Sequence, residues 1–133
     1  MKIPLRLVIP FLTSFLALAA SLQAAAATLD SEAAKSLITG RMWQQPQPHG
    51  TGQLYWSWNS DGSVCLRTDG KTGNCADTGT WKLDGDRICY KLTWYGKTSG
   101  RQSACFRISD KQKGLYEALQ DNGLTLFEFS VVK

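Results

Sequence analysis

The chain has 133 residues, of which 43% are hydrophobic, and its formal net charge is +4 at pH 7. A charge this small, carried by basic residues that stand singly or in twos, argues against a surface that binds nucleic acid. The length is sufficient for one domain with a modest core.

The first residues have the features of a secretory signal peptide. Basic residues precede an apolar run over residues 7–20, and Ala24 and Ala26 supply the small residues of a cleavage site. The run is shorter than the roughly 20 apolar residues that a membrane-spanning helix needs, and no later segment approaches that length. The sequence therefore predicts a signal peptide over 1–26, a single domain over 27–133, no membrane span, and a periplasmic or secreted protein.

One short helix is expected at the start of the mature chain. Asp30 is a good N-cap for a helix over Ala33–Thr39, and Gly40 is suited to end it. Trp43 then falls on a possible first strand. The segment Gln44–Gly52 is rich in proline and glycine and is predicted to be a loop.

Regularly spaced turn residues divide the rest of the chain into short strands. Alternation of apolar and polar residues within them predicts an all-β fold, in which an antiparallel meander of seven or eight strands follows the helix and closes into a small barrel. A two-sheet sandwich is the alternative. The expected strands are Gln53–Trp58, Ser63–Thr68, Asp77–Leu83, Asp86–Trp94, Arg101–Ile108, Gly114–Gln120 and Leu124–Val131.

Asp-Gly pairs set the register of two hairpins. A three-residue loop that ends in Gly62 places Trp58 opposite Val64. A two-residue turn at 84–85 places Trp81 opposite Ile88.

The cysteines predict two disulfide bonds, because they form pairs that are each symmetric about a turn, as directly opposed residues of a hairpin are. Pairing of the second two also sets Ile88 opposite Phe106, so that apolar residues share one face of the sheet and the disulfide lies on the other. Each bond is expected to stabilise the domain by about 3 kcal/mol. The predicted pairs are Cys65 with Cys75 and Cys89 with Cys105.

Aromatic residues are the main candidates for both the core and a binding surface. Four tryptophans fall on the apolar face of their strands and are expected to fill the barrel: Trp56, Trp58, Trp81 and Trp94. Three further aromatic residues lie in loops or on the opposite face and are the candidate ligand-binding residues: Trp43, Tyr55 and Tyr95.

Glu117 and Glu128 are the only suggestive pair of carboxylates. A two-residue turn at 122–123 would oppose them directly, as in a general acid and base, whereas a three-residue loop over 121–123 would place them on opposite faces. Solvated surface glutamates are the simpler interpretation. The sequence leaves both registers open.

No metal, cofactor or catalytic site is predicted. His49 is the single histidine and lies in the proline-rich loop, without a serine or cysteine partner. The cysteines are better explained as disulfides than as metal ligands. The Asp-Gly pairs occupy turns and do not have the spacing of a calcium-binding loop. The protein is therefore not expected to be an enzyme.

Residues 40–108 contain an Asp-Gly turn, a Gly-x-Trp motif at Gly79, a strand that carries Cys89, and a second cysteine. In these motifs the chain resembles a family of small exported proteobacterial proteins that is known only as a domain of unknown function. The resemblance implies export and a β fold and brings no activity with it. A short helix followed by glycine and Trp43 is also similar to lipocalin-type barrels, a likeness of fold alone.

Two functions of different classes follow. The first is a binding module that holds a small apolar or sugar-like ligand in the mouth of the barrel. The second is an envelope interaction protein, or an inhibitor-like protein, that presents loops such as Gln44–Gly52 to another exported protein. The volume left inside the barrel discriminates between them, because an interior filled by tryptophan has no room for a ligand. A hydrolase that uses Glu117 and Glu128 is a third possibility.

Overall fold

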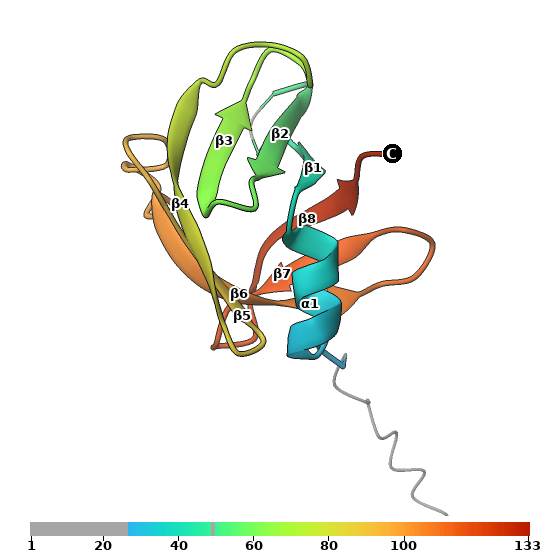
Figure 1. Ribbon diagram of the computed structural model, residues 1–133. Helices are drawn as coiled ribbons and strands as arrows, with labels where there is room; N and C mark the ends of the chain where they lie inside the picture. Colours follow the sequence, from blue (N-terminus) through green and yellow to red (C-terminus); the bar gives the residue numbers. More distant parts are fainter. Residues whose placement is uncertain (1–26, 49) are drawn as a thin grey trace, which may run out of the picture.

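A computed structural model describes residues 27–48 and 50–133 of the protein (Figure 1). The predicted signal peptide and His49 lie outside these residues. One helix, α1 (Ser31–Ile38), precedes eight strands. Its N-cap is Asp30, whose carboxylate accepts a hydrogen bond from the backbone N–H of Ala33 at 2.8 Å. This is the capping interaction that the sequence predicted.

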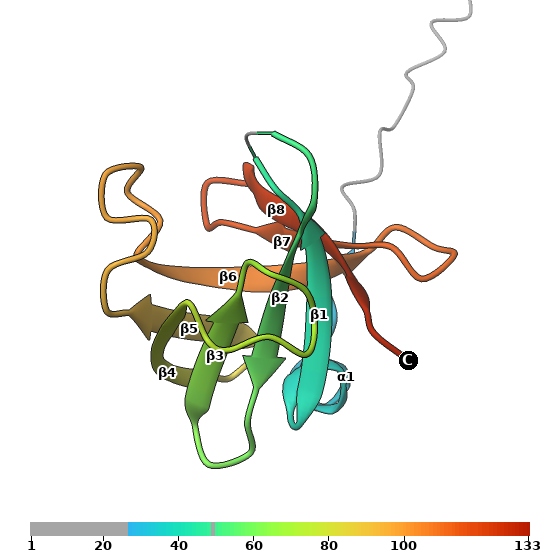
Figure 2. The same ribbon diagram turned by 90° about the horizontal axis from the view of Figure 1, so that it is seen from above.

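The strands form a closed antiparallel barrel in which each strand pairs with the next along the chain. Pairing of the last strand with the first closes the barrel, with Trp43 opposite Val131. Figures 1 and 2 show the strands curving round a common interior, with α1 beside β1. The strands are β1 (Arg41–Pro46), β2 (Gln53–Trp58), β3 (Ser63–Arg67), β4 (Asp77–Asp84), β5 (Arg87–Leu92), β6 (Ser103–Asp110), β7 (Tyr116–Leu119) and β8 (Thr125–Val131).

A meander places alternate connections at opposite ends of the barrel. The connections 59–62, 85–86 and 111–115 share one end with α1, and we call it the closed end. The connections at the other end, which we call the mouth, are 47–52, 68–76, 93–102 and 120–124.

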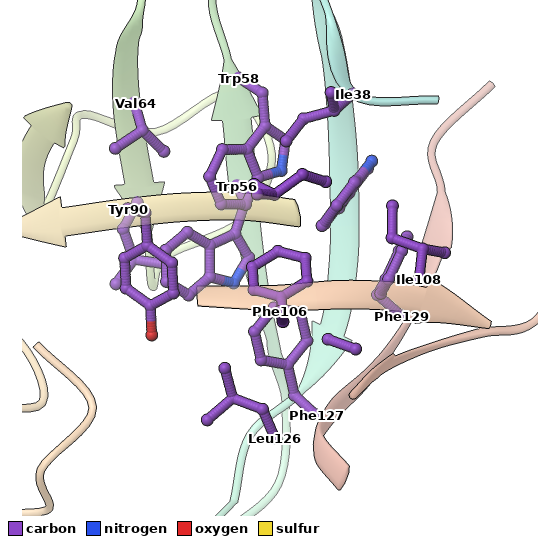
Figure 3. Packing of buried hydrophobic residues seen from close by; sticks show 14 of the residues in the cluster. Ile38, Trp56, Trp58, Val64, Tyr90, Phe106, Ile108, Leu126, Phe127 and Phe129 are labelled. Carbon is purple, nitrogen blue, oxygen red and sulfur yellow. The ribbon is translucent and has the colours of Figure 1, made fainter. Parts of the chain in front are cut away.

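Aromatic side chains fill the closed end. The ring of Trp43 stacks on Phe129, with centroids 3.8 Å apart, and its indole N–H donates to the backbone carbonyl of Leu37 in α1 at 3.0 Å. Figure 3 shows Ile38 of α1 beside Trp58 at this end of the cluster. Trp43, Trp58 and Ile38 have no exposed surface, so helix and barrel share one core.

Both predicted disulfides are present, and they differ in their setting. Cys89 lies directly opposite Cys105 in the sheet, with Cα atoms 4.0 Å apart. Cys65 instead lies opposite Thr78 and reaches Cys75 in the connection before β4, at a Cα separation of 5.4 Å. The prediction that the first pair would be directly opposed is therefore wrong. Disulfides are typical of exported proteins.

Other registers were partly predicted. Trp58 lies opposite Val64, and Ile88 lies opposite Phe106, as expected. In the hairpin of β4 and β5, however, Trp81 lies opposite Tyr90 because the turn residues are 85–86 rather than 84–85. The register shifts by two residues, which keeps each side chain on its predicted face.

Within the described part of the chain, α1 is too short and too polar to cross a bilayer, and no other helix there meets that requirement.

Candidate functional site

A cavity of about 860 Å³ opens at the mouth of the barrel. Its volume is within the range of roughly 300–1,000 Å³ that is usual for ligand pockets. Strands β1, β2, β5 and β8 form the floor, and the connection 93–102 forms the roof. The lining residues are Gln45, Pro48, Leu54, Trp56, Tyr90, Trp94, Tyr95, Gly96, Lys97, Thr98, Ser99, Arg101 and Phe127.

The floor of the pocket is made of rings that pack on one another. Trp56 stacks with Phe127 at a centroid distance of 5.8 Å and meets Tyr90 edge to face at 5.2 Å. All three rings are less than a tenth exposed, so they are held firmly and turn only limited faces toward the cavity. In Figure 3, Phe127 and Leu126 lie at the end of the cluster opposite Ile38.

One polar side chain is buried in the floor beside these rings. Gln45 is 6% exposed, and its Oε1 accepts a hydrogen bond from the indole Nε1 of Trp56 at 2.8 Å. An indole N–H only donates, so this bond fixes which way the amide group is turned. The amide nitrogen of Gln45 then remains as a donor, and within residues 27–48 and 50–133 it has no hydrogen-bond partner.

The roof is tied to the barrel by the buried carboxylate of Asp77. Asp77 lies at the start of β4, and its Oδ2 accepts hydrogen bonds from the backbone N–H groups of Trp94 at 2.9 Å and Tyr95 at 2.8 Å. Its other oxygen accepts from the Thr93 hydroxyl and the Thr78 N–H. Burial by itself raises the pKa of Asp77, but these hydrogen bonds outweigh it and lower the pKa below the ordinary value of 3.8.

The far end of the roof is tied by Tyr90. Its hydroxyl donates to the backbone carbonyl of Arg101 at 2.8 Å, and in Figure 3 its oxygen points away from the end where Ile38 lies. Burial raises the pKa of Tyr90 to about 12, against the opposing effect of the positive charge of Arg101. The phenol is therefore protonated at neutral pH and serves as a donor.

The sharp bend of the roof requires glycine at position 96. Gly96 has a φ of +78°, and a Cβ there would lie 2.8 Å from the carbonyl carbon of Arg101. The N–H of Arg101 donates to the carbonyl of Gly96 at 2.8 Å, which closes the bend. The roof is thus held at its start, its bend and its end.

Of the three predicted binding residues, the structure brings only Tyr95 into the pocket. Tyr55 is half-buried on β2, where Leu54 and Trp56 on either side of it point inward, so its ring is on the outer face of the barrel. Trp43 is a correction: it is fully buried at the closed end and is not available as a surface residue. The strand β1 extends to Pro46, so the predicted loop Gln44–Gly52 is shorter than expected.

The four tryptophans that were predicted to fill the core differ in their burial. Trp56 and Trp58 are buried, and Trp81 is half-buried. Trp94 is a correction, because β5 ends at Leu92 and the indole of Trp94 is 56% exposed at the rim of the pocket.

Glu117 and Glu128 are directly opposed, although the loop between their strands is the three-residue one. Gln120 donates its N–H to the carbonyl of Leu124, and a register shift between Ala118 and Leu119 restores the opposition. Lys111 lies between the two carboxylates, with Nζ 2.6 Å from Glu128 and 3.5 Å from Glu117. The hydrogen bond to Glu128 raises the pKa of Lys111. This arrangement is an ion-pair cluster on the surface, away from the pocket.

Two residues of the site were not predicted from the sequence. Asp77 was assigned to a strand and Gln45 to a loop. The signal for Asp77 was its position at the start of a strand, where a carboxylate reaches backbone N–H groups of a neighbouring connection. Gln45 gave no signal, because its role depends on contact with Trp56, which lies on the neighbouring strand β2. Among the described residues, no group of three metal-ligating side chains occurs.

Comparison with known proteins places the chain in a family but assigns no activity. No curated protein and no solved structure matches it. The likeness to lipocalin-type barrels therefore stays a prediction. A family model described as protein of unknown function (DUF995) matches residues 7–129. This match confirms the expected family of unknown function, and the chain belongs to DUF995.

Proposed function

We propose that the protein is a non-catalytic binding module that holds a small apolar molecule in the mouth pocket. The observation that carries this proposal is the contrast within one interior: a packed closed end adjoins a cavity of about 860 Å³ with an aromatic floor. A barrel of about eight strands is of the size that holds one small ligand. The paired cysteines support a periplasmic or secreted location for this binding.

The polar atoms of the floor favour an apolar ligand over a sugar. The indole N–H of Trp56 is bonded to Gln45, and the hydroxyl of Tyr90 is bonded to Arg101, so among these three described side chains only the amide nitrogen of Gln45 is left as a free donor. A sugar has many hydroxyl groups that each need a partner when they leave water. The floor offers mostly ring faces and the side chain of Leu54, so an apolar body matches it better.

Native mass spectrometry of the mature protein from its own host tests the proposal. A complex with additional mass, which is released under denaturing conditions, is expected and would identify the ligand. A bare protein would argue against a resident ligand. It would favour the second candidate function, interaction with another exported protein through the mouth loops, for which the exposed indole of Trp94 is the supporting observation.

A titration in solution gives a second test with a matched control. We expect the neutral fluorescent probe N-phenyl-1-naphthylamine to bind the protein and to bind Tyr95→Ala about tenfold more weakly, because the variant loses one aromatic wall. Tyr55→Ala removes the same side chain from the outer face and should bind the probe as the wild type does. Equal weakening by both variants, or the absence of any binding, contradicts the proposal.

A further inference from the structure

We propose that the ligand of the mouth pocket is an amphiphile with a single anionic head group, of the kind that a long-chain carboxylate carries. This inference rests on the proposed function and names the ligand class for the same pocket. It is carried by two independent features of the lining: an amide donor in the floor with no partner among the described residues, and a set of charged side chains of one sign in the roof.

The first feature is the amide nitrogen of Gln45. The side chain is more than nine-tenths buried and lines the pocket, and its oxygen is already committed to Trp56. Within the described residues, the two N–H groups on that nitrogen have no acceptor. That nitrogen is not one of the fully buried polar atoms that lack a partner, so it is open to the pocket. A ligand that covers it without bringing an acceptor would leave it without a hydrogen bond, so a ligand with an acceptor is favoured.

The second feature is the charge of the roof. Among the described lining residues, the charged side chains are Lys97 and Arg101, and both are cationic. Neither forms an ion pair within residues 27–48 and 50–133. Burial raises the pKa of Tyr90 in the floor, and the positive charge of Arg101 opposes that rise.

Both features lie at the mouth of the barrel, one in the floor of the pocket and the other in its roof. Gln45 is the last residue but one of β1, next to the mouth, and Lys97 and Arg101 belong to the connection above it. The apolar part of the lining adjoins Gln45: Leu54 lies opposite it in the sheet, Trp56 is bonded to it, and Phe127 lies near the start of β8, at the same end of the barrel. An acceptor-bearing head group between Gln45 and the cationic roof, with an apolar body on the adjoining rings, satisfies both parts at once. A carboxylate is favoured because charge-assisted hydrogen bonds are stronger than neutral ones.

Three dodecyl compounds with one chain and different head groups test the inference: dodecanoate, dodecan-1-ol and dodecyltrimethylammonium. Each is titrated below its micellar concentration at pH 8 and low ionic strength, with displacement of N-phenyl-1-naphthylamine as the readout. Dodecanoate should bind at least about tenfold more tightly than the alcohol, and the cationic compound should bind most weakly.

Variants locate the preference. Gln45→Glu keeps the acceptor for the indole of Trp56 and replaces the free donor by a carboxylate oxygen, so the preference for dodecanoate should disappear. A buried glutamate is costly to the fold, so the pair Lys97→Gln and Arg101→Gln gives a second test on exposed side chains. It should reduce dodecanoate affinity about tenfold without weakening the alcohol. Lys82→Gln, on an exposed side chain of β4 outside the pocket, is the matched control.

The outcomes separate the inference from the proposed function. If the alcohol or the cationic compound binds as tightly as dodecanoate, the inference is wrong and the binding function stands. If none of the three displaces the probe and the probe itself does not bind, the proposed function fails as well. A preference for dodecanoate that survives all of the pocket variants would place the anion elsewhere and overturn the inference.

Discussion

The two ends of this barrel are built from the same kinds of residues, yet one is packed and the other is hollow. At the closed end α1 lies against the rings, with Ile38 and the backbone carbonyl of Leu37 in contact with the core. At the mouth the covering segment is the connection 93–102, whose central residues 96–100 are small or polar. What covers the rings therefore decides whether the interior is filled, because the strands at both ends supply aromatic side chains.

The largest expected effect separates the ends by stability. Trp43→Ala at the closed end should lower the free energy of unfolding by about 4 kcal/mol, because it leaves a cavity in a packed core. Trp94→Ala at the mouth should change it by less than about 0.5 kcal/mol, because the indole is 56% exposed. Urea unfolding of both variants measures the difference, and similar losses would mean that the mouth is packed as tightly as the closed end.

The next effect concerns the two disulfide bonds of the barrel. Replacing Cys89 and Cys105 by serine should lower the free energy of unfolding by about 3 kcal/mol, since the bond closes a short loop between β5 and β6. Loss of the Cys65–Cys75 bond should have a similar cost. Reduction of both bonds should leave the domain marginal or unfolded. A thermal unfolding temperature that does not respond to reductant would contradict this.

A smaller effect is confined to the mouth and depends on pH. Asp77→Asn should cost about 2 kcal/mol, because it weakens hydrogen bonds from the roof to a charged acceptor. The folded-state pKa of Asp77 lies below its unfolded value, so this contribution is present above pH 3.8 and is lost as the pH falls through the folded-state pKa.

The measurement is the difference in unfolding free energy between the wild type and Asp77→Asn at a series of pH values. The difference should be constant near neutral pH and should shrink below about pH 4. The Trp43 contact with Leu37 at the closed end involves no titrating group, so Trp43→Ala should show no matching change in this interval. A difference that persists at low pH would show that Asp77 does not act through its charge.

The sequence predicted the barrel because local patterns and the cysteine spacing agree on it. The register of Cys89 and Cys105 followed from two patterns at once, the symmetry of the pair and the apolar alternation on either side. The turn at 85–86 was misplaced because a shift by two residues leaves that alternation unchanged, and only contacts across the sheet distinguish the two registers.

The pocket itself was less predictable. Trp43 and Trp94 exchanged their expected roles, because alternation assigns a face but does not say where a strand ends. Trp43 belongs to β1, which continues to Pro46. Proline has no N–H to donate to a neighbouring strand, so it is tolerated at the end of a strand but not in its middle. Trp94 lies beyond the end of β5, where Asp77 diverts the backbone into the roof. Neither event has a local signal in the sequence.

The hydrogen bonds that hold the roof bear on how this protein evolves and on how it can be redesigned. Asp77 and Tyr90 both form hydrogen bonds with the backbone of the connection 93–102. Asp77 accepts from the N–H groups of Trp94 and Tyr95, and Tyr90 donates to the carbonyl of Arg101. The identity of most side chains in the segment does not affect these bonds. Residues 97–99 are thus open to exchange without loss of the scaffold, whereas Gly100, with a φ of +71°, is not. New binding preferences are accessible through a handful of substitutions while the barrel stays the same.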